Sequence, residues 1–272
     1  MKIIIPTLGR MDKQVTYQNL PNHWKNHVSF IVQDHEYAEM NKRFPGKVYG
    51  LPADIKRIAP TRNWIYNKFA ADRYFVMDDD LSFIVKRPNP DPEGTVWLTR
   101  KMSDADFDDS IKQVEDWMNE GIVYGCFNPT WVMPSLSGYP FSENGKIMTN
   151  CFFNGPELPK GIQWERVDAA EDFDVNLQLL TQGFANRISG RYMVSPSETN
   201  AEGGCSIWRT LELHNESQRK LHALWPNFVK LREKEVKSGV WKGQKKLATT
   251  IYHKKAFASS QKPDNNLEEL FA

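Results

Sequence analysis

The stretch of sequence that decides the fold is Tyr74-Phe75-Val76-Met77-Asp78-Asp79-Asp80-Leu81. Its first four residues are apolar or aromatic and lack helical spacing, which predicts a short strand buried in a parallel sheet. The three aspartates that follow repel one another, and this is costly unless a cation lies among them. Ligands of open α/β sheets bind just beyond the carboxyl ends of the strands, so the triplet lies where a site is expected.

Two interpretations of the triplet compete. An isolated acidic turn exposed to solvent is common in proteins, and it needs no ligand. The buried strand directly before the three aspartates favours the other interpretation, a site for Mg²⁺ or Mn²⁺ shared with the phosphates of a substrate.

The sequence around this stretch alternates strands with short helices. Apolar and β-branched runs predict strands at residues 2–5, 28–32 and 48–51, and helices are predicted at residues 36–44 and 58–71. This alternation indicates an α/β fold with a mostly parallel, Rossmann-like sheet flanked by helices.

Length and composition agree with a globular α/β protein. A chain of 272 residues with 40% hydrophobic residues suits one large α/β domain, alone or with a smaller appendage. It has no run of eighteen apolar residues, and it opens on a predicted strand instead of a signal peptide. Its three cysteines are far apart, so they indicate neither a disulfide framework nor a zinc site. We therefore expect a cytoplasmic protein without a membrane span.

Two further elements place basic side chains where phosphates can bind. Thr7 and Arg10 lie in the loop after the first strand, and Arg62 and Asn63 lie near the start of the helix at residues 58–71, whose dipole favours anions. The loop alone is a weak signal, because a Gly and an Arg in a loop usually make only a turn and a solvated side chain.

A second acidic cluster precedes a predicted helix near residues 175–182. Acidic residues at a helix start ordinarily serve as caps, which explains one of them but not four within seven residues. One of the four, with Asp172 as the first candidate, can act as a general base that deprotonates an attacking hydroxyl. The cluster consists of Asp168, Glu171, Asp172 and Asp174.

The C-terminal region is strongly basic. Residues 219–255 hold eleven Lys and Arg against two Glu, a charge of +9 in a chain of net charge +1. Residues 214–234 are predicted to be helical. Such a region suits a polyanion such as DNA, with Lys242, Lys245 and Lys246 as candidate contacts, although charge runs are often only a solvated face.

Taken together, the motifs resemble the GT-A-fold, nucleotide-sugar-dependent glycosyltransferases over residues 1–190. The resemblance implies that Pro6, Thr7, Arg10, Asp34, Arg62, Asp78 and Asp79 bind the donor, with Asp34 reading the base. Thr61 stands where the family usually has Ala before its Arg-Asn pair. It further implies that Asp78 and Asp80 hold Mn²⁺ or Mg²⁺, that His214, or else His222, is a further metal ligand, and that Glu171 and Asp172 form the late catalytic motif.

Within this fold the layout is similar to phage glycosyltransferases that modify 5-hydroxymethylpyrimidines in DNA, including arabinosyltransferases, glucosyltransferases and the TET-associated group. The compact size, the loop at residues 200–204 and the basic C-terminus carry this narrower resemblance. It implies transfer of a pentose such as arabinose, or of glucose, from a UDP-sugar to 5-hydroxymethylcytosine or a related modified base in double-stranded phage DNA. An acceptor base must then leave the stack, and Trp131 or Trp164 would line the space that receives it.

Three alternatives stay open. The same fold can act on a saccharide, lipid or protein acceptor; a nucleotidyltransferase also joins acidic residues to Mg²⁺; and a DNA-binding module would need no catalysis. We expect a catalytic domain at residues 1–212, a basic helical extension at residues 213–272 packed on it, and a monomer.

Overall fold

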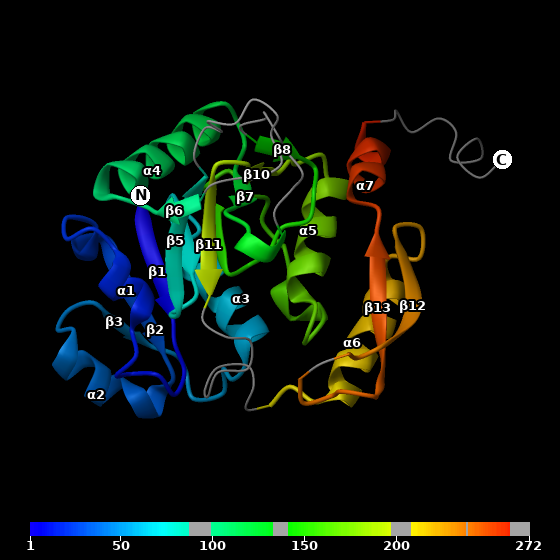
Figure 1. Ribbon diagram of the computed structural model, residues 1–272, viewed down its shortest axis with the longest axis horizontal. Coiled ribbons are helices and arrows are strands. Elements are labelled where there is room, and N and C mark those ends of the chain that lie inside the picture. The colour runs from blue at the N-terminus through cyan, green and yellow to red at the C-terminus, as the bar shows by residue number, and fades with distance from the viewer. Residues whose placement is uncertain (87–98, 133–140, 197–207, 238, 262–272) are drawn as a thin grey trace.

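The computed structural model describes residues 1–86, 99–132, 141–196, 208–237 and 239–261. Its centre is an eight-stranded sheet in the order β3-β2-β1-β4-β9-β7-β10-β8 (Figure 1). Neighbours among β1 to β4 are parallel, as are β7 and β10, whereas β9 is antiparallel to both of its neighbours and β8 is antiparallel at the edge. The strands are β1 (Lys2–Pro6), β2 (Val28–Val32), β3 (Val48–Gly50), β4 (Tyr74–Met77), β7 (Tyr124–Cys126), β8 (Phe141–Glu143), β9 (Cys151–Asn154) and β10 (Arg187–Ser189).

Helices cover both faces of this sheet, because alternate side chains of each strand point to opposite sides. Ile3 and Ile5 of β1 belong to a core packed against α4, whereas Ile4 belongs to a second core packed against α3 and α5. The predicted α/β class with flanking helices is therefore confirmed. The helical elements of this body are α1 (Val15–Asn19), α2 (Asp34–Arg43), α3 (Ile58–Lys68), α4 (Asp104–Asn119) and α5 (Glu171–Thr181), with single turns η1 (Trp24–His27), η2 (Thr130–Val132) and η3 (Trp164–Arg166).

A smaller antiparallel sheet, in the order β11-β5-β6, continues from the aspartate triplet. Its strands are β5 (Leu81–Lys86), β6 (Thr99–Lys101) and β11 (Tyr192–Pro196). Since β5 begins one residue after Asp80, the triplet is held between two strands and its backbone has little freedom.

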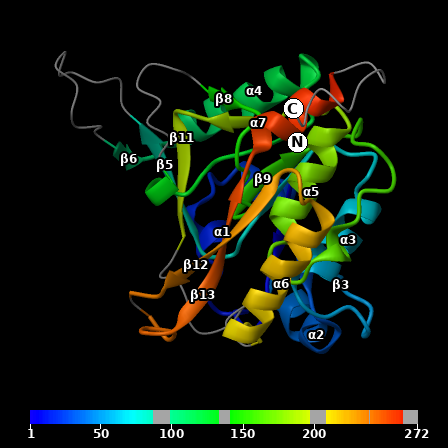
Figure 2. The ribbon, with the colours of Figure 1, turned by 90° about the vertical axis from the view of Figure 1, so that its right-hand side faces the viewer.

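The C-terminal segment differs from the helical extension that the sequence predicts. It forms α6 (Leu211–Leu224), a hairpin of β12 (Val229–Glu235) and β13 (Lys245–Ile251), and α7 (His253–Ser260). The predicted helix at residues 214–234 is wrong beyond Leu224, because Pro226 cannot continue a helix and the short run Val229–Arg232 alternates between apolar and basic residues, as a strand does. Figure 2 shows the hairpin beside α6.

A third core joins this segment to the body. Leu221 of α6, Val229 of β12 and Ala256 of α7 are fully buried against Leu177 and Leu180 of α5. No helix within the described residues is long and apolar enough to cross a membrane. The loop at residues 200–204 lies outside the described residues.

Candidate active site

A cavity of about 840 Å³ opens where β1, β2 and β4 end. Pro6 lines it from the end of β1, Thr7 and Arg10 from the loop that follows, Gln33 from the end of β2, and the aspartate triplet from the end of β4. This volume lies within the roughly 300–1,000 Å³ that is usual for small-molecule sites. The cavity therefore lies beyond the carboxyl ends of the parallel strands, where ligands of open α/β sheets bind.

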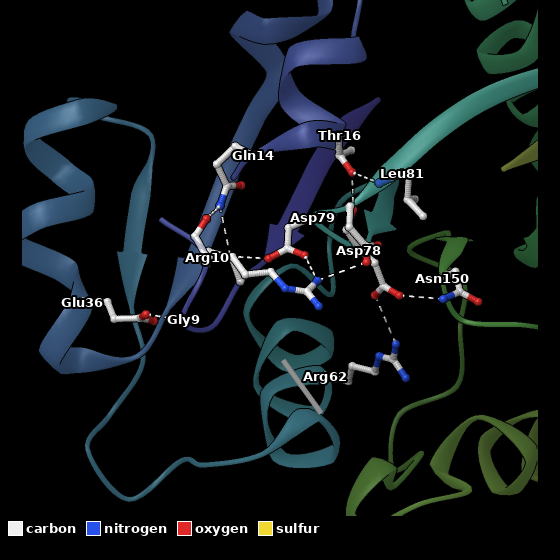
Figure 3. A network of polar contacts seen from close by, with 12 residues as sticks. Gly9, Arg10, Gln14, Thr16, Glu36, Arg62, Asp78, Asp79, Leu81 and Asn150 are labelled. Atoms are coloured by element: carbon white, nitrogen blue, oxygen red, sulfur yellow. Dashed lines mark hydrogen bonds and ion pairs between the residues drawn. The ribbon is translucent and has the colours of Figure 1, made fainter. Parts of the chain in front are cut away.

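Arg10 ties the loop after β1 to the aspartate triplet. Its Nη1 lies 2.8 Å from Asp79 Oδ1 and 3.1 Å from Asp80 Oδ2 (Figure 3). The hydroxyl of Thr7 donates to the other oxygen of Asp79, which is buried. Burial and the neighbouring charge of Asp79 raise the pKa of Asp80, and Arg10 opposes this rise.

Asp78 has other polar partners than Asp79 and Asp80. Asn150 Nδ2 donates to its Oδ2 at 2.8 Å, and Arg62 Nη2 lies 3.7 Å from its Oδ1 (Figure 3). Burial raises the pKa of Asp78 to about 7, and the charge of Arg62 opposes that rise without cancelling it. The carboxylate therefore lies in a place that favours an additional cation.

Arg62 joins the two acidic clusters, which are about ninety residues apart in the sequence. Its Nη1 donates to Glu171 Oε1 at 2.5 Å, and its Nη2 donates to the carbonyl of Thr149 at 2.9 Å. The guanidinium is buried and lies over the rings of Phe152 and Trp164. A planar group with several donors suits this bridge better than a lysine would.

Asp172 lies beside Glu171 in the first turn of α5 and lines the cavity. Its Oδ1 accepts a hydrogen bond from the Phe173 amide at 2.9 Å. Burial raises the pKa of Asp172, while Arg62 and Lys146 oppose the rise. A carboxylate with a raised pKa at the wall of a cavity suits a general base.

The other two acids of the late cluster have different surroundings. Asp168 pairs with Arg57 at 3.3 Å and is exposed, although it also lines the cavity. Asp174 is fully buried and accepts hydrogen bonds from Trp225 Nε1 at 2.7 Å and Gln178 Nε2 at 2.9 Å. Asp174 thus fixes the C-terminal segment to α5, which explains one acid of the cluster without catalysis.

The residues that would hold a divalent cation are Asp78 and Asp80. Their hard carboxylate oxygens suit Mg²⁺ or Mn²⁺, and Mg²⁺ commonly uses one or two carboxylates together with substrate phosphates. In the described parts of the chain, His, Cys, Asp and Glu side chains form no group of three or more that could hold a metal ion. Two carboxylates are a donor set that suits such a cation when substrate phosphates complete its shell.

Neither histidine joins the two aspartates in such a group. His214 lines the cavity, but its Nε2 is hydrogen-bonded to the Leu247 carbonyl at 2.9 Å, and its ring lies 5.8 Å from that of Trp241. His222 Nδ1 is hydrogen-bonded to the Val229 carbonyl at 2.7 Å and supports the hairpin. The expected third ligand is thus not part of a cluster with Asp78 and Asp80.

The two tryptophans expected at the acceptor have different positions. Trp131 lines the cavity and is 60% exposed, so its ring is free to stack against a ligand. Trp164 is 1% exposed and packs against Phe152 in the core. The expectation that Trp164 lines the acceptor space is wrong, because Phe152 of β9 and the core that it forms with α3 and α5 bury the ring.

The remaining predicted contacts lie partly outside the cavity. Lys246 lines it, whereas Lys242 and Lys245 are exposed beyond it and Lys245 pairs with Glu233 at 2.8 Å. Asp34 is the first residue of α2 and is absent from the lining, where its neighbour Gln33 lies instead.

Several lining residues had no sequence signal. Lys146, Trp208, Arg209 and His253 come from loops and from the start of α7, and no motif surrounds them. His253 Nε2 is buried without a hydrogen-bond partner among the described residues, and burial lowers the pKa of this imidazole to about 4. Only folding brings these side chains to the cavity opposite the aspartates.

The cavity lies at the end of a parallel sheet, and an arginine bridges its two acidic clusters. This arrangement is the one expected of transferases that act on phosphorylated donors. Comparison with known proteins makes this class specific. The model of the TET-Associated Glycosyltransferase family matches residues 1–204, and the chain belongs to this family. The protein is therefore a glycosyltransferase, and the resemblance inferred from its motifs is confirmed.

Similar proteins come from two phages. The chain is 25% identical over 244 residues to the "Beta-glucosyl-HMC-alpha-glucosyl-transferase" of Enterobacteria phage T6, and 25% identical over 246 residues to that of phage T2. Each match covers 87% of this chain and 85% of the relative. Among solved structures, a glucose-1-phosphate thymidylyltransferase from Bacillus anthracis matches with a TM-score of 0.38 at 13% identity, covering 84% of this chain and 96% of that one.

Proposed function

We propose that this glycosyltransferase transfers a sugar from a nucleoside diphosphate sugar to 5-hydroxymethylcytosine, or to a sugar already attached to it, in phage DNA. The observation that carries this proposal is the match to two phage enzymes whose names specify a glucosylated hydroxymethylcytosine acceptor. That match covers 87% of the chain and so includes most of the cavity and part of the C-terminal segment. Glucose, carried by UDP, is the first donor to test, and arabinose is the second.

Different side chains of the cavity have different roles in such a reaction. Arg10 and Arg62 lie on the two sides of the triplet, where they can bind the diphosphate and stabilise the charge that it gains on leaving. Mg²⁺ or Mn²⁺, held by Asp78 and Asp80, supplies further positive charge to the same leaving group when it is bound. The exposed ring of Trp131 offers a face for the acceptor base, which must leave the DNA stack.

Asp172 has one of two roles, depending on the stereochemistry. In an inverting reaction it accepts the proton of the attacking hydroxyl, a task for which its raised pKa is suited. In a retaining reaction no such base is needed, and Asp172 instead orients the acceptor or the donor sugar. The anomeric configuration of the product distinguishes the two roles.

A transfer assay tests this function. The protein is incubated with Mn²⁺ or Mg²⁺, a panel of UDP- and GDP-sugars, and duplex DNA that contains cytosine, 5-hydroxymethylcytosine or its β-glucosylated form. After digestion, the masses of the nucleosides are measured. We expect a hexose or pentose increment only on a hydroxymethylated DNA, and we expect its loss in Asp80→Asn.

Other outcomes contradict specific parts of the proposal. Release of the nucleotide without an increment on any DNA would move the acceptor to a saccharide, lipid or protein. Release of pyrophosphate instead of a nucleoside diphosphate would indicate nucleotidyl transfer. An increment that persists in Asp80→Asn would exclude the proposed role of the triplet.

A further inference from the structure

The hairpin of β12 and β13 separates its charges between its two faces. Its antiparallel register pairs Lys230 with Thr250, Arg232 with Ala248, and Lys234 with Lys246. Because side chains of directly paired residues point to the same side of a sheet, these six residues share one face. Four of them are basic and none is acidic. We name this surface, formed by Lys230, Arg232, Lys234 and Lys246, the basic face.

The opposite face of the hairpin is used for packing. It carries Leu231, Leu247 and Thr249, and it adjoins α6: the Leu247 amide donates to Asn215 at 2.7 Å, and Thr249 Oγ1 donates to Gln218 at 3.0 Å. Both glutamates of the hairpin, Glu233 and Glu235, also lie on this side, together with Lys245, which pairs with Glu233. The acidic residues therefore do not neutralise the basic face.

The basic cations are available for a partner. Lys230, Arg232 and Lys234 are exposed, Lys246 is partly exposed, and within the described part of the chain none of the four takes part in an ion pair. The ammonium of Lys230 lies over the ring of Tyr252, which is itself 40% exposed. An aromatic ring beside cations adds a contact that suits nucleic acids.

The basic face also reaches the cavity. Strand β13 lines the cavity with residues of both faces: Lys246 and Ala248 belong to the basic face, and Leu247, Thr249 and Ile251 belong to the opposite face. The three cations of β12 span about 13 Å along the strand, over which one strand of DNA carries about four phosphates. A partner bound here would thus lie beside the entrance of the candidate active site.

We propose that the basic face binds the phosphate backbone of the DNA duplex whose base enters the cavity. This inference rests on the proposed function. It assigns DNA contact to Lys230, Arg232 and Lys234 as well as Lys246, and it assigns none to Lys245, whose charge lies on the opposite face beside Glu233.

Two triple variants test the inference. K230Q/R232Q/K234Q removes three charges from the basic face, and K42Q/K68Q/K160Q removes three exposed charges from the body of the molecule as the matched control. Binding of a hydroxymethylated duplex is titrated at several salt concentrations, KM and kcat are measured on the same duplex, and transfer is measured on the free 5-hydroxymethyl nucleoside. Thermal unfolding is followed for both variants.

In the basic-face variant, the slope of log K against log salt becomes shallower by about 2 to 3, since each phosphate contact contributes about 0.9. KM for the duplex rises about tenfold or more, because phosphate contacts supply much of the affinity. The kcat on the duplex and transfer to the free nucleoside stay within about twofold of the wild-type values, because these residues do not touch the reacting atoms. The control variant keeps most of the wild-type slope and KM.

The result that overturns the inference is a basic-face variant whose slope and KM equal those of the control. Failure of the proposed function is a different observation. If the wild-type protein binds DNA through the basic face but transfers no sugar to any DNA, the proposed acceptor is wrong. The proposed role of the basic face in binding DNA is then still supported.

Discussion

At the scale of single residues, Arg62 determines how the candidate site is built. Arg62 is a buried, charged residue of α3. Its side chain reaches Asp78 on one side and Glu171 on the other. Arg62 and Glu171 are each only 6% exposed. Removing one partner of a buried ion pair leaves an uncompensated charge, which is costly.

The first prediction concerns this pair. Arg62→Met lowers the free energy of unfolding by about 3–5 kcal/mol, because Glu171 loses its buried partner. Adding Glu171→Gln restores part of this loss, since the uncompensated charge is removed, but it does not restore sugar transfer. Urea unfolding followed by circular dichroism measures the stabilities. A double variant no more stable than Arg62→Met would contradict the role given to the pair.

The second prediction concerns Asp172 and pH. Burial raises the pKa of this carboxylate above its ordinary value near 4. A general base must be deprotonated, so the rate of an inverting enzyme falls as the pH drops through this raised pKa. Asp172→Asn lowers kcat by about 10²–10⁴-fold and removes this acid limb of the pH profile.

The comparison variant for this experiment is Asp168→Asn, which changes an exposed carboxylate of the same cluster. It keeps the acid limb and most of the rate. An unchanged pH profile in Asp172→Asn would show that Asp172 is not the base, and would favour the retaining alternative.

At the scale of elements, α4 shows how local sequence fixes a boundary. Ser103 Oγ accepts a hydrogen bond from the Asp106 amide, and Asp106 accepts one from the Ser103 amide, so the two form a capping box. Arg100 also pairs with Asp106. Because α4 covers one face of the sheet, this cap contributes to the core that supports β4.

The third prediction tests the cap. Ser103→Ala lowers the free energy of unfolding by about 1 kcal/mol at neutral pH and leaves sugar transfer unchanged.

The ion pair with Arg100 and the hydrogen bonds from Ser103 hold the pKa of Asp106 well below its ordinary value. Its contribution is therefore complete above about pH 4 and is lost as the pH falls further. The stability difference between wild type and Asp106→Asn, measured by urea unfolding, should shrink below pH 4, and a constant difference would contradict this account.

Local patterns made the first half of the fold predictable. The four consecutive apolar residues Tyr74–Met77 lack helical spacing and therefore predict a buried strand. All four are buried in β4, and the site lies at the end of this strand. The hairpin was not predictable in the same way, because charges at Lys230, Arg232 and Lys234 left only Val229 and Leu231 as an apolar signal.

The candidate site was predictable only where its residues sit in local motifs. Arg10, Asp78 and Asp172 follow or precede recognisable elements, and all three line the cavity. Trp164 and the cavity residue His253 depend on contacts between distant segments, and no local pattern distinguishes a buried tryptophan from one that faces a ligand. The pairing of Arg62 with Glu171 also joins distant segments, although each of the two residues lies in a local motif of its own.

At the scale of the whole molecule, the C-terminal segment is part of one structure with the sheet domain. It shares a core with α5, and the indole of Trp225 donates to the fully buried Asp174. The same segment supplies Lys246 and His253 to the cavity. The site therefore depends on the docking of this segment as well as on the sheet.

The fourth prediction concerns this docking. Trp225→Phe removes the indole donor to Asp174 and lowers the free energy of unfolding by about 1–3 kcal/mol. It also makes the C-terminal segment easier to cleave in limited proteolysis. Trp241→Phe, at the turn of the hairpin, changes stability by less than about 0.5 kcal/mol. Equal behaviour of the two variants would show that the contact with Asp174 does not hold the segment in place.

The measurement that tests the central claim most directly is a calorimetric titration of the protein with UDP-glucose in the presence of Mn²⁺. The claim is that the cavity at the aspartate triplet binds a nucleotide sugar. It predicts saturable binding at one site, weakened at least about tenfold by Arg10→Gln, which removes the cation beside Asp79 and Asp80. Arg43→Gln, which removes an exposed arginine of α2, should leave the affinity unchanged. Absence of binding by any UDP- or GDP-sugar, or equal affinity in Arg10→Gln and wild type, would contradict the claim.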